Sequence, residues 1–336
     1  MQNILLDCHA HIAPIVPARL AGLPGVEWFP EEPRLLLDGG VSLASPSVFK
    51  PEALIAWMDA QSISRAWFSV PPPMYRAVLD EAGARRWCDY VNPALIEIAA
   101  PFAARLSPTF LLPVRHPALA AEIVAEFAPR GARFAMAAGH ASSALVLSDA
   151  AYDPLWAALD AANAFLLLHP TSGSDPRLDP FFLHNLVGGP GETALAAAHL
   201  AMSKITERFP NIRFILSHGG GSAALVAGRL ARGQAVRRPG ADTGAAPMTQ
   251  AFRRFMVDCI THSAPALALV AQVFGEDQVL FGSDWPFSMG LIRPHAQLAD
   301  VEPGLRARIM AADPERTITQ TDRSSDDNAV ALVSGS

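Results

Sequence analysis

The sequence predicts an α/β protein and, more narrowly, a (β/α)8 TIM barrel with loop insertions on its C-terminal face. Short apolar or β-branched runs recur along the chain, and longer stretches of helical composition separate them. Eight such runs are present, which is the number of strands in a closed barrel. The alternative is a doubly wound open sheet, which the lack of a Gly-x-Gly-x-x-Gly motif after the first run disfavours.

The predicted strands are the short apolar runs 4–12, 65–70, 109–114, 132–138, 164–169, 213–218, 254–260 and 279–284. The predicted helices are the amphipathic stretches 51–61, 117–127, 151–162, 194–209, 263–274 and 303–311. Two inserts, 21–50 and 171–193, follow the first and fifth strands, so we expect them on the face where barrel enzymes build their sites. Residues 1–314 are predicted to form a single domain, and the polar segment 315–336 is predicted to be a disordered tail or an arm.

Composition narrows the class of protein. Of the 336 residues, 51% are hydrophobic and 17% are charged, which indicates a buried core rather than a disordered chain. The net charge of −6 argues against a nucleic acid or an anionic membrane surface as partner, and no apolar run reaches membrane-spanning length. Three cysteines are too few for a disulfide framework, so we expect a cytoplasmic protein.

The first predicted strand ends in His9-Ala10-His11. Side chains two residues apart on a strand point the same way, so both imidazoles would converge at the C-terminal end of this strand. Two neutral imidazoles side by side form half of a typical metal site.

Three later strands end in matching groups, namely His169, His218 and Asp284. Each of these residues alone is as well explained by an ordinary role in a turn or a helix cap. In a barrel, however, all the C-terminal strand ends open on one face, so the five residues would meet. Three histidines and one aspartate form a suitable ligand set for Zn²⁺ or a similar divalent ion, with a position left for water or substrate. His140 and His262 follow the fourth and seventh strands and are candidates for substrate contact.

At these residues the sequence resembles the amidohydrolase superfamily, and more narrowly the amidohydrolase-2 group of aminocarboxymuconate semialdehyde decarboxylases and benzoate decarboxylases. The motifs that carry the resemblance are Asp-Cys-His9-Ala-His11, Leu-His169-Pro, Leu-Val-Gly-Gly-Pro-Gly-Glu192-Thr, Ser-His218-Gly-Gly-Gly with Gly228-Arg229, Asp258-Cys-Ile-Thr-His262 and Gly-Ser-Asp284-Trp-Pro. The resemblance implies a distorted barrel that holds one divalent metal ion, most simply Zn²⁺, with Mn²⁺ as the other choice.

The resemblance also implies residue roles. His9, His11, His169 and Asp284 would be the metal ligands, and His218 and Asp284 would handle protons. Arg229 would reach the active site of a neighbouring subunit and bind a substrate carboxylate, which implies a homodimer. Trp285, beside Asp284 in the matching motif, would contact substrate.

Three features of the sequence refine this resemblance. Relatives with two metals bridge them with a modified lysine on the fourth strand, and residues 132–139 contain no lysine, so a mononuclear site is favoured. Thr171 stands where the comparable decarboxylase has an aromatic residue, and no arginine lies in 44–50 to bind substrate acid groups. Lys50 and Arg34 are the available substitutes.

We therefore predict a metal-dependent, non-oxidative decarboxylase (a C–C lyase) that acts on an unsaturated or aromatic small-molecule carboxylate without an organic cofactor. The alternative is a metal-dependent hydrolase of an amide, lactone or other carbonyl compound that uses the same residues, because fold and ligands do not separate the two reactions. A third hypothesis is a binding or scaffold protein with a relic metal site, against which the intact set of five residues argues.

Overall fold

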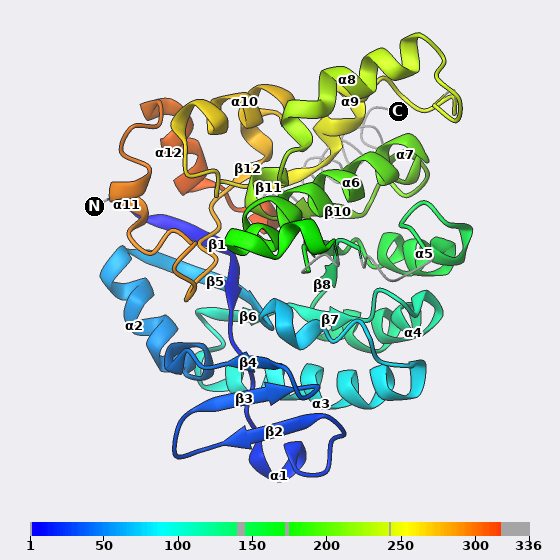
Figure 1. Ribbon diagram of the computed structural model, residues 1–336. Coiled ribbons are helices and arrows are strands. Elements are labelled where there is room, and N and C mark those ends of the chain that lie inside the picture. The colour runs from blue at the N-terminus through cyan, green and yellow to red at the C-terminus, as the bar shows by residue number, and fades with distance from the viewer. Residues whose placement is uncertain (1, 140–144, 172–174, 242, 317–336) are drawn as a thin grey trace, which may run out of the picture.

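The computed structural model describes residues 2–139, 145–171, 175–241 and 243–316. Its central sheet is parallel and follows chain order (Figure 1). The strands are β1 Ile4–His11, β5 Ile63–Ser69, β6 Leu106–Pro108, β7 Phe110–Leu112, β8 Arg133–Ala137, β9 Phe165–His169, β10 Arg213–Leu216, β11 Met256–Asp258 and β12 Val279–Leu280. Strands β6 and β7 occupy one position in the sheet: only Thr109 separates them, β6 pairs with β5, and β7 pairs with β8.

Backbone hydrogen bonds close the sheet into a ring beyond the end of β12. The Cys8 N–H donates to Phe281 O over 2.9 Å, and the His11 N–H donates to Trp285 O over 2.8 Å. These bonds join β1 to the segment after β12, so eight strand positions surround one centre. The predicted (β/α)8 barrel is confirmed, and the interruption at Thr109 makes it a distorted one.

Helices cover the outside of this ring (Figure 1). The longer ones are α2 Pro51–Gln61, α3 Glu81–Ala99, α4 Pro117–Phe127, α5 Asp153–Ala161, α6 Gly189–Met202, α8 Ala223–Ala235, α10 Ala264–Phe274 and α12 Pro303–Ala311. Short helices are α1 Pro17–Leu20, α7 Ile205–Arg208, α9 Met248–Ala251 and α11 Pro294–Gln297. No helix in the described ranges is long and apolar enough to cross a membrane.

Two apolar clusters stabilise the barrel. The larger one lies between the strands and the helices. The smaller one fills the barrel interior and consists of Leu6, Cys8, Trp67, Ala135, Phe165, Leu167, Ile215 and Leu280. Its members come from strands all around the ring, as the packed interior of a TIM barrel requires. The polar residues of the next section lie at the C-terminal ends of the same strands.

Strand β1 contains a β-bulge that places its polar residues. Asp7 pairs with Ala66 of β5, but Ala10 pairs with Phe68, so β1 has one extra residue between these pairs. Such an insertion reverses the alternation of side chains along a strand. Cys8 can therefore face the interior cluster while His9 and His11, which regular alternation would put on the opposite face, point inward as well.

The insert 21–50 forms a small antiparallel sheet of β2 Val26–Phe29, β3 Arg34–Leu37 and β4 Val41–Leu43. Arg76 ties this sheet to the barrel. Its Nε donates to Asp38 Oδ2 over 3.0 Å, and its guanidinium lies 4.8 Å from the ring centre of Trp87.

Several predicted boundaries were wrong. The insert 171–193 is shorter, because α6 begins at Gly189 rather than at 194; Pro190 is compatible with the first turn of a helix, where no N–H partner is lost. The predicted helix 194–209 is two helices, since Lys204 adopts a left-handed φ of 64° between α6 and α7. Helices α3 and α8 were not among the predicted stretches.

The first residues of the predicted tail or arm, 315–336, include one that contacts the barrel. Glu315 binds Arg133 over 2.7 Å and Arg65 over 2.8 Å, so this residue is attached to the barrel. The rest of the tail, 317–336, lies outside the described residues.

Candidate metal centre

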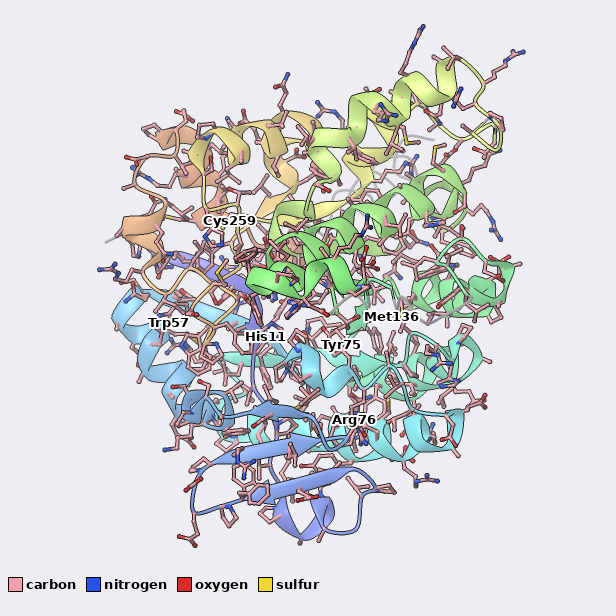
Figure 2. All side chains as sticks on the ribbon, viewed as in Figure 1. His11, Trp57, Tyr75, Arg76, Met136 and Cys259 are labelled. Carbon is pink, nitrogen blue, oxygen red and sulfur yellow. The ribbon has the colours of Figure 1, made fainter. Side chains whose placement is uncertain are left out.

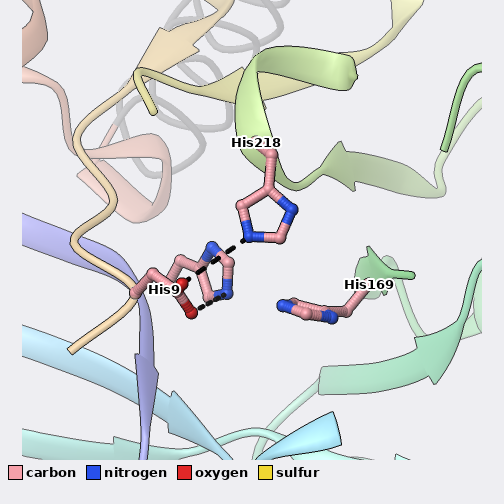
Figure 3. A group of neighbouring side chains, drawn as sticks. His9, His169 and His218 are labelled. Carbon is pink, nitrogen blue, oxygen red and sulfur yellow. Dashed lines mark ion pairs between the residues drawn. The ribbon is translucent and has the colours of Figure 1, made fainter. Parts of the chain in front are cut away.

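The predicted site residues meet at the C-terminal end of the barrel. His9 and His11 come from β1, His169 is the last residue of β9, and His218 and Asp284 follow β10 and β12 closely. In the part of the chain that the structure describes, one group could hold a metal ion: His9, His169, His218 and Asp284 each offer a ligand atom, and these atoms lie within 4.8 Å of one another. Figure 3 shows the three imidazoles directed toward one another.

His11 belongs to the same cluster by its distances. Its Nε2 lies 3.0 Å from His9 Nε2 and 3.0 Å from Asp284 Oδ1. Asp284 Oδ1 is also 3.5 Å from His9 Nε2, and Asp284 Oδ2 is 3.8 Å from His218 Nε2. The predicted convergence of His9, His11, His169, His218 and Asp284 is therefore present in the structure.

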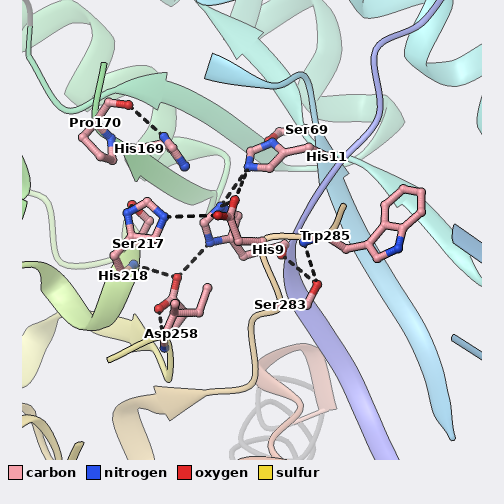
Figure 4. Close-up of polar contacts among 12 residues, drawn as sticks. His9, His11, Ser69, His169, Pro170, Ser217, His218, Asp258, Ser283 and Trp285 are labelled. Atoms are coloured by element: carbon pink, nitrogen blue, oxygen red, sulfur yellow. Dashed lines mark hydrogen bonds and ion pairs between the residues drawn. The ribbon is translucent and has the colours of Figure 1, made fainter. Parts of the chain in front are cut away.

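The hydrogen bonds of the three buried histidines determine which nitrogens face the centre (Figure 4). His9 Nδ1 donates to Asp258 Oδ2 over 2.8 Å, His11 Nδ1 to Val70 O over 3.1 Å, and His169 Nδ1 to Pro170 O over 2.9 Å. All three acceptors lack a hydrogen atom, so each Nδ1 carries one. In the neutral imidazoles every Nε2 then presents a lone pair to the centre.

This arrangement fits a divalent cation. Two Nε2 lone pairs only 3.0 Å apart, on His9 and His11, repel each other unless a positive charge lies between or beside them. The buried His169 Nε2 and Asp284 Oδ1 have no hydrogen-bond partner of acceptable geometry, which is costly for polar atoms without another ligand. Three imidazole nitrogens fixed by outer acceptors and one carboxylate are the usual ligands of zinc and related ions.

Burial and neighbouring charges set the protonation states. Burial lowers the pKa of His11, and burial together with the nearby His218 lowers the pKa of His169 far below the usual range, so both are neutral ligands at neutral pH. Burial alone would also lower the pKa of His9, but the hydrogen bond to Asp258 and the charge of Asp284 raise it. Burial alone would raise the pKa of Asp284, but the adjacent imidazoles of His11 and His218 hold it well below its usual range.

Asp258 belongs to a motif named from the sequence, but the sequence assigned it no role at the site. The fully buried carboxylate accepts four hydrogen bonds, from His9 Nδ1, from the backbone N–H groups of His218 and Gly219, each over 2.8 Å, and from the Ile260 N–H over 3.0 Å. It thereby holds both the His9 ring and the turn that carries His218. The available signal was its position near the end of the seventh predicted strand, 254–260, close to the ends of the strands that carry the other polar residues.

His218 and Asp284 both sit on strained backbone. Their φ angles are 55° and 57°, in the left-handed region that non-glycine residues seldom adopt. Such strain is common at functional sites, where the surrounding structure enforces it. At His218 the enforcing contacts include the two hydrogen bonds from the turn to Asp258. His218 is also the most exposed member of the cluster, with 23% of its side chain accessible.

Of the remaining candidates, those that the structure describes lie outside the cluster. His140 lies outside the described residues. His262 is exposed beyond β11 and lines a separate cavity with Leu267 and Leu291. Trp285 packs in the core with its ring centre 6.3 Å from that of Trp57, and Figure 4 shows its indole on the far side of β1 from the histidines. Arg229 is exposed on α8.

The two cations named as substitutes for the missing arginine point elsewhere. The Arg34 guanidinium lies 3.9 Å from the ring centre of Phe29 on the small sheet, and Lys50 is exposed just before α2. The three cysteines are free and buried, and burial raises the pKa of each thiol, which agrees with the lack of any sequence signal for a cysteine nucleophile.

Comparison with known proteins agrees with this geometry. A family model described as amidohydrolase matches residues 6–317. A 2-amino-3-carboxymuconate-6-semialdehyde decarboxylase of Dictyostelium discoideum is 31% identical over 152 residues, which are 44% of this chain and 42% of that relative. The chain thus matches less than half the length of this relative. A gamma-resorcylate decarboxylase of Rhodococcus jostii is 25% identical over 309 residues, which cover 85% of this chain and 88% of that relative.

A solved structure shows the same fold. A dihydroxybenzoic acid decarboxylase of Polaromonas sp. JS666, with bound manganese and the inhibitor 2-nitroresorcinol, superposes with a TM-score of 0.70. It is 19% identical in sequence, and the match covers 92% of this chain and 94% of the other. At this identity the likeness concerns the fold.

Proposed function

This chain belongs to the amidohydrolase family, and on that premise we propose that it is a metal-dependent, non-oxidative decarboxylase of an aromatic or otherwise unsaturated carboxylate. The observation that carries the proposal is the set of inward lone pairs at one barrel end, with a single partly exposed histidine, His218, beside them. The relatives whose names describe decarboxylation support the reaction type.

We propose His9, His11, His169 and Asp284 as the ligands of one divalent ion. When bound, the ion would supply electrostatic polarisation of a substrate oxygen. Zn²⁺ is the ion we favour because the set is rich in imidazole, and Mn²⁺ is the alternative. Strand β8 has no lysine that could bridge a second ion, so the proposed site is mononuclear.

His218 is the proposed proton donor. Its Nε2 would deliver a proton to the substrate carbon that bears the carboxylate. The protonated intermediate can then accept the electron pair of the C–C bond. That bond then breaks, CO2 leaves, and its electron pair restores the conjugated system, so that carboxylate plus proton give CO2 and the protonated carbon skeleton. Asp284 Oδ2, 3.8 Å from His218 Nε2, would stabilise the charged imidazole before the transfer.

We further propose a homodimer in which Arg229 reaches the neighbouring site. Six exposed apolar residues lie on α8, on α6, which packs against α8, and on the segment just before α6: Phe181, Phe182, Leu186, Val187, Leu195 and Leu225. Phe181 is 86% exposed and Leu225 is 76% exposed, which is unfavourable unless a partner covers them. Leu225 and Arg229 are one helical turn apart, so a second copy that covers Leu225 would also meet Arg229.

A cytoplasmic location is proposed from cysteine usage. Free, buried thiols without a disulfide are typical of a reducing compartment.

The first test is metal content per chain in the wild type and in His169→Ala, with turnover of aromatic carboxylates followed as CO2 release. We expect about one ion per chain in the wild type, less than a tenth of that in His169→Ala, and no CO2 release without the ion. His295→Ala is the matched control, because it removes only the hydrogen bond from His295 Nε2 to Gln61 O on the outer layer.

Each result has a clear meaning. Two ions per chain would contradict the mononuclear site. A metal-loaded enzyme that cleaves amides or lactones but releases no CO2 would favour hydrolysis. Absence of metal from both proteins would refute the centre itself.

A further inference from the structure

Tyr75 has a buried hydroxyl that nothing in the proposed mechanism uses. The chain contains three tyrosines. Tyr90 donates its hydroxyl hydrogen to Pro14 O over 2.8 Å, and Tyr152 donates to Val114 O. Tyr75 is 5% exposed and its hydroxyl has no hydrogen-bond partner of acceptable geometry. A buried hydroxyl left without a partner is unfavourable, so its persistence suggests a ligand.

The hydroxyl belongs to the environment of the metal centre. The Tyr75 ring stands edge-on to His169, with ring centres 6.2 Å apart and planes at 87°. The hydroxyl lies close to that of Ser69, which itself is 3.2 Å from His11 Nδ1. Figure 2 shows Tyr75 near His11 in the middle of the molecule.

The next residue, Arg76, is not free to act there. Its guanidinium is held by Asp38, by Pro24 O over 2.8 Å, and by stacking on Trp87. Arg34 and Lys50 also lie away from the centre. The segment after β5 therefore presents a neutral hydroxyl, not a guanidinium, toward the cluster.

We propose that the Tyr75 hydroxyl binds an oxygen of the substrate carboxylate as a neutral hydrogen-bond donor. The inference rests on the proposed function. A neutral donor suits a carboxylate that leaves as uncharged CO2, because it orients the group without stabilising its charge as strongly as an arginine would. The ordinary pKa of a tyrosine hydroxyl is about 10, so this group carries its hydrogen at neutral pH.

The test is binding of benzoate to zinc-loaded protein by calorimetry, in the wild type and in Tyr75→Phe. The variant keeps the ring and removes only the unpartnered hydroxyl, so its melting temperature and metal content should equal or exceed those of the wild type. We expect the Kd for benzoate to rise about 10-fold or more in Tyr75→Phe, as the loss of a hydrogen bond to a charged group predicts.

Tyr90→Phe is the matched control. It breaks a satisfied hydrogen bond away from the centre, so it should lower the melting temperature and leave the Kd for benzoate unchanged. Equal benzoate affinity in Tyr75→Phe and wild type would overturn the role of Tyr75 while leaving carboxylate binding intact. A metal-loaded wild type that binds no benzoate would overturn the carboxylate substrate class, and the role of Tyr75 with it.

Discussion

At the scale of single residues, the centre depends on which nitrogen of each imidazole carries the hydrogen. Two of the three fixing acceptors are backbone carbonyls, Val70 O and Pro170 O. The third is a side chain, the carboxylate of Asp258, which also accepts a hydrogen bond from the backbone N–H of His218. Asp258 is therefore a positioning residue on which a proposed ligand and the proposed proton donor both depend.

Asp258→Asn should weaken metal binding about 10- to 100-fold and reduce turnover further than the lost metal explains. The amide keeps the shape of the side chain. In the wild type, however, N–H groups donate to both carboxylate oxygens of Asp258, and the NH2 group that replaces one of these oxygens cannot accept a hydrogen bond. The His9 ring loses its fixed tautomer, and the His218 turn loses an anchor. The measurement is metal affinity by chelator competition, followed by kcat at saturating metal.

Asp160→Asn provides the comparison for this variant. Asp160 also accepts a backbone N–H, from Asn211 over 2.8 Å, but it lies near the N-terminal end of β9, opposite His169. It should leave metal affinity and kcat unchanged. If Asp258→Asn recovers full kcat once metal is saturating, Asp258 positions only the ligand His9.

At the scale of elements, regular patterns were predictable and their interruptions were not. Helices α2, α4 and α12 begin and end at the predicted residues, because their apolar residues recur with helical spacing. Helix α3 contains Pro93 in its interior, which obscures that pattern. The bulge in β1 has no signature in the local sequence, since the extra residue is defined by pairing with β5. The convergence of the histidines was predictable from strand ends alone, whereas the role of Asp258 required its hydrogen bonds.

The ion pairs at the N-terminal end of the barrel hold the end of the described chain. Glu315 binds Arg65 of β5 and Arg133 of β8, and only 27% of its side chain is accessible. Glu315→Ala should lower the free energy of unfolding by about 1–2 kcal/mol, because it leaves two partly buried guanidinium groups with fewer partners. Denaturant unfolding measures this change.

Glu276→Ala is the reference for that experiment. Glu276 pairs with Arg308 over 3.1 Å, but both side chains are more than half exposed. Its loss should change the free energy of unfolding by less than about 0.5 kcal/mol. Equal effects of the two substitutions would mean that the pairs of Glu315 add no more than an ordinary surface contact.

At the scale of the whole molecule, the fold brings together strand ends that are far apart in the chain. His9 and Asp284 are joined through the backbone bonds that close the barrel, since the Asp284 N–H donates to His9 O over 2.7 Å. The backbone contacts that close the ring therefore also bring two of the site residues together. This explains why residues of β1 and of the segment after β12 could be assigned to one site only through a hypothesis about the complete fold.

In the proposed dimer, each active site also includes a residue from the other subunit, Arg229. This can be tested by complementation. Arg229→Ala and His218→Asn should each be inactive as homodimers. Arg229→Ala removes the arginine that a chain supplies to its partner's site, and His218→Asn removes the proton donor from the chain's own site. In a mixed dimer, the site that keeps His218 receives Arg229 from the other chain and is intact. Random reassociation of equal amounts should thus restore about a quarter of wild-type activity, because half of the dimers are mixed and each has one intact site. If Arg229 acted within its own chain, every site would lack one of the two residues and mixing would restore nothing.

Leu225→Asp, which introduces a charge into the apolar surface, should give monomers that still bind metal.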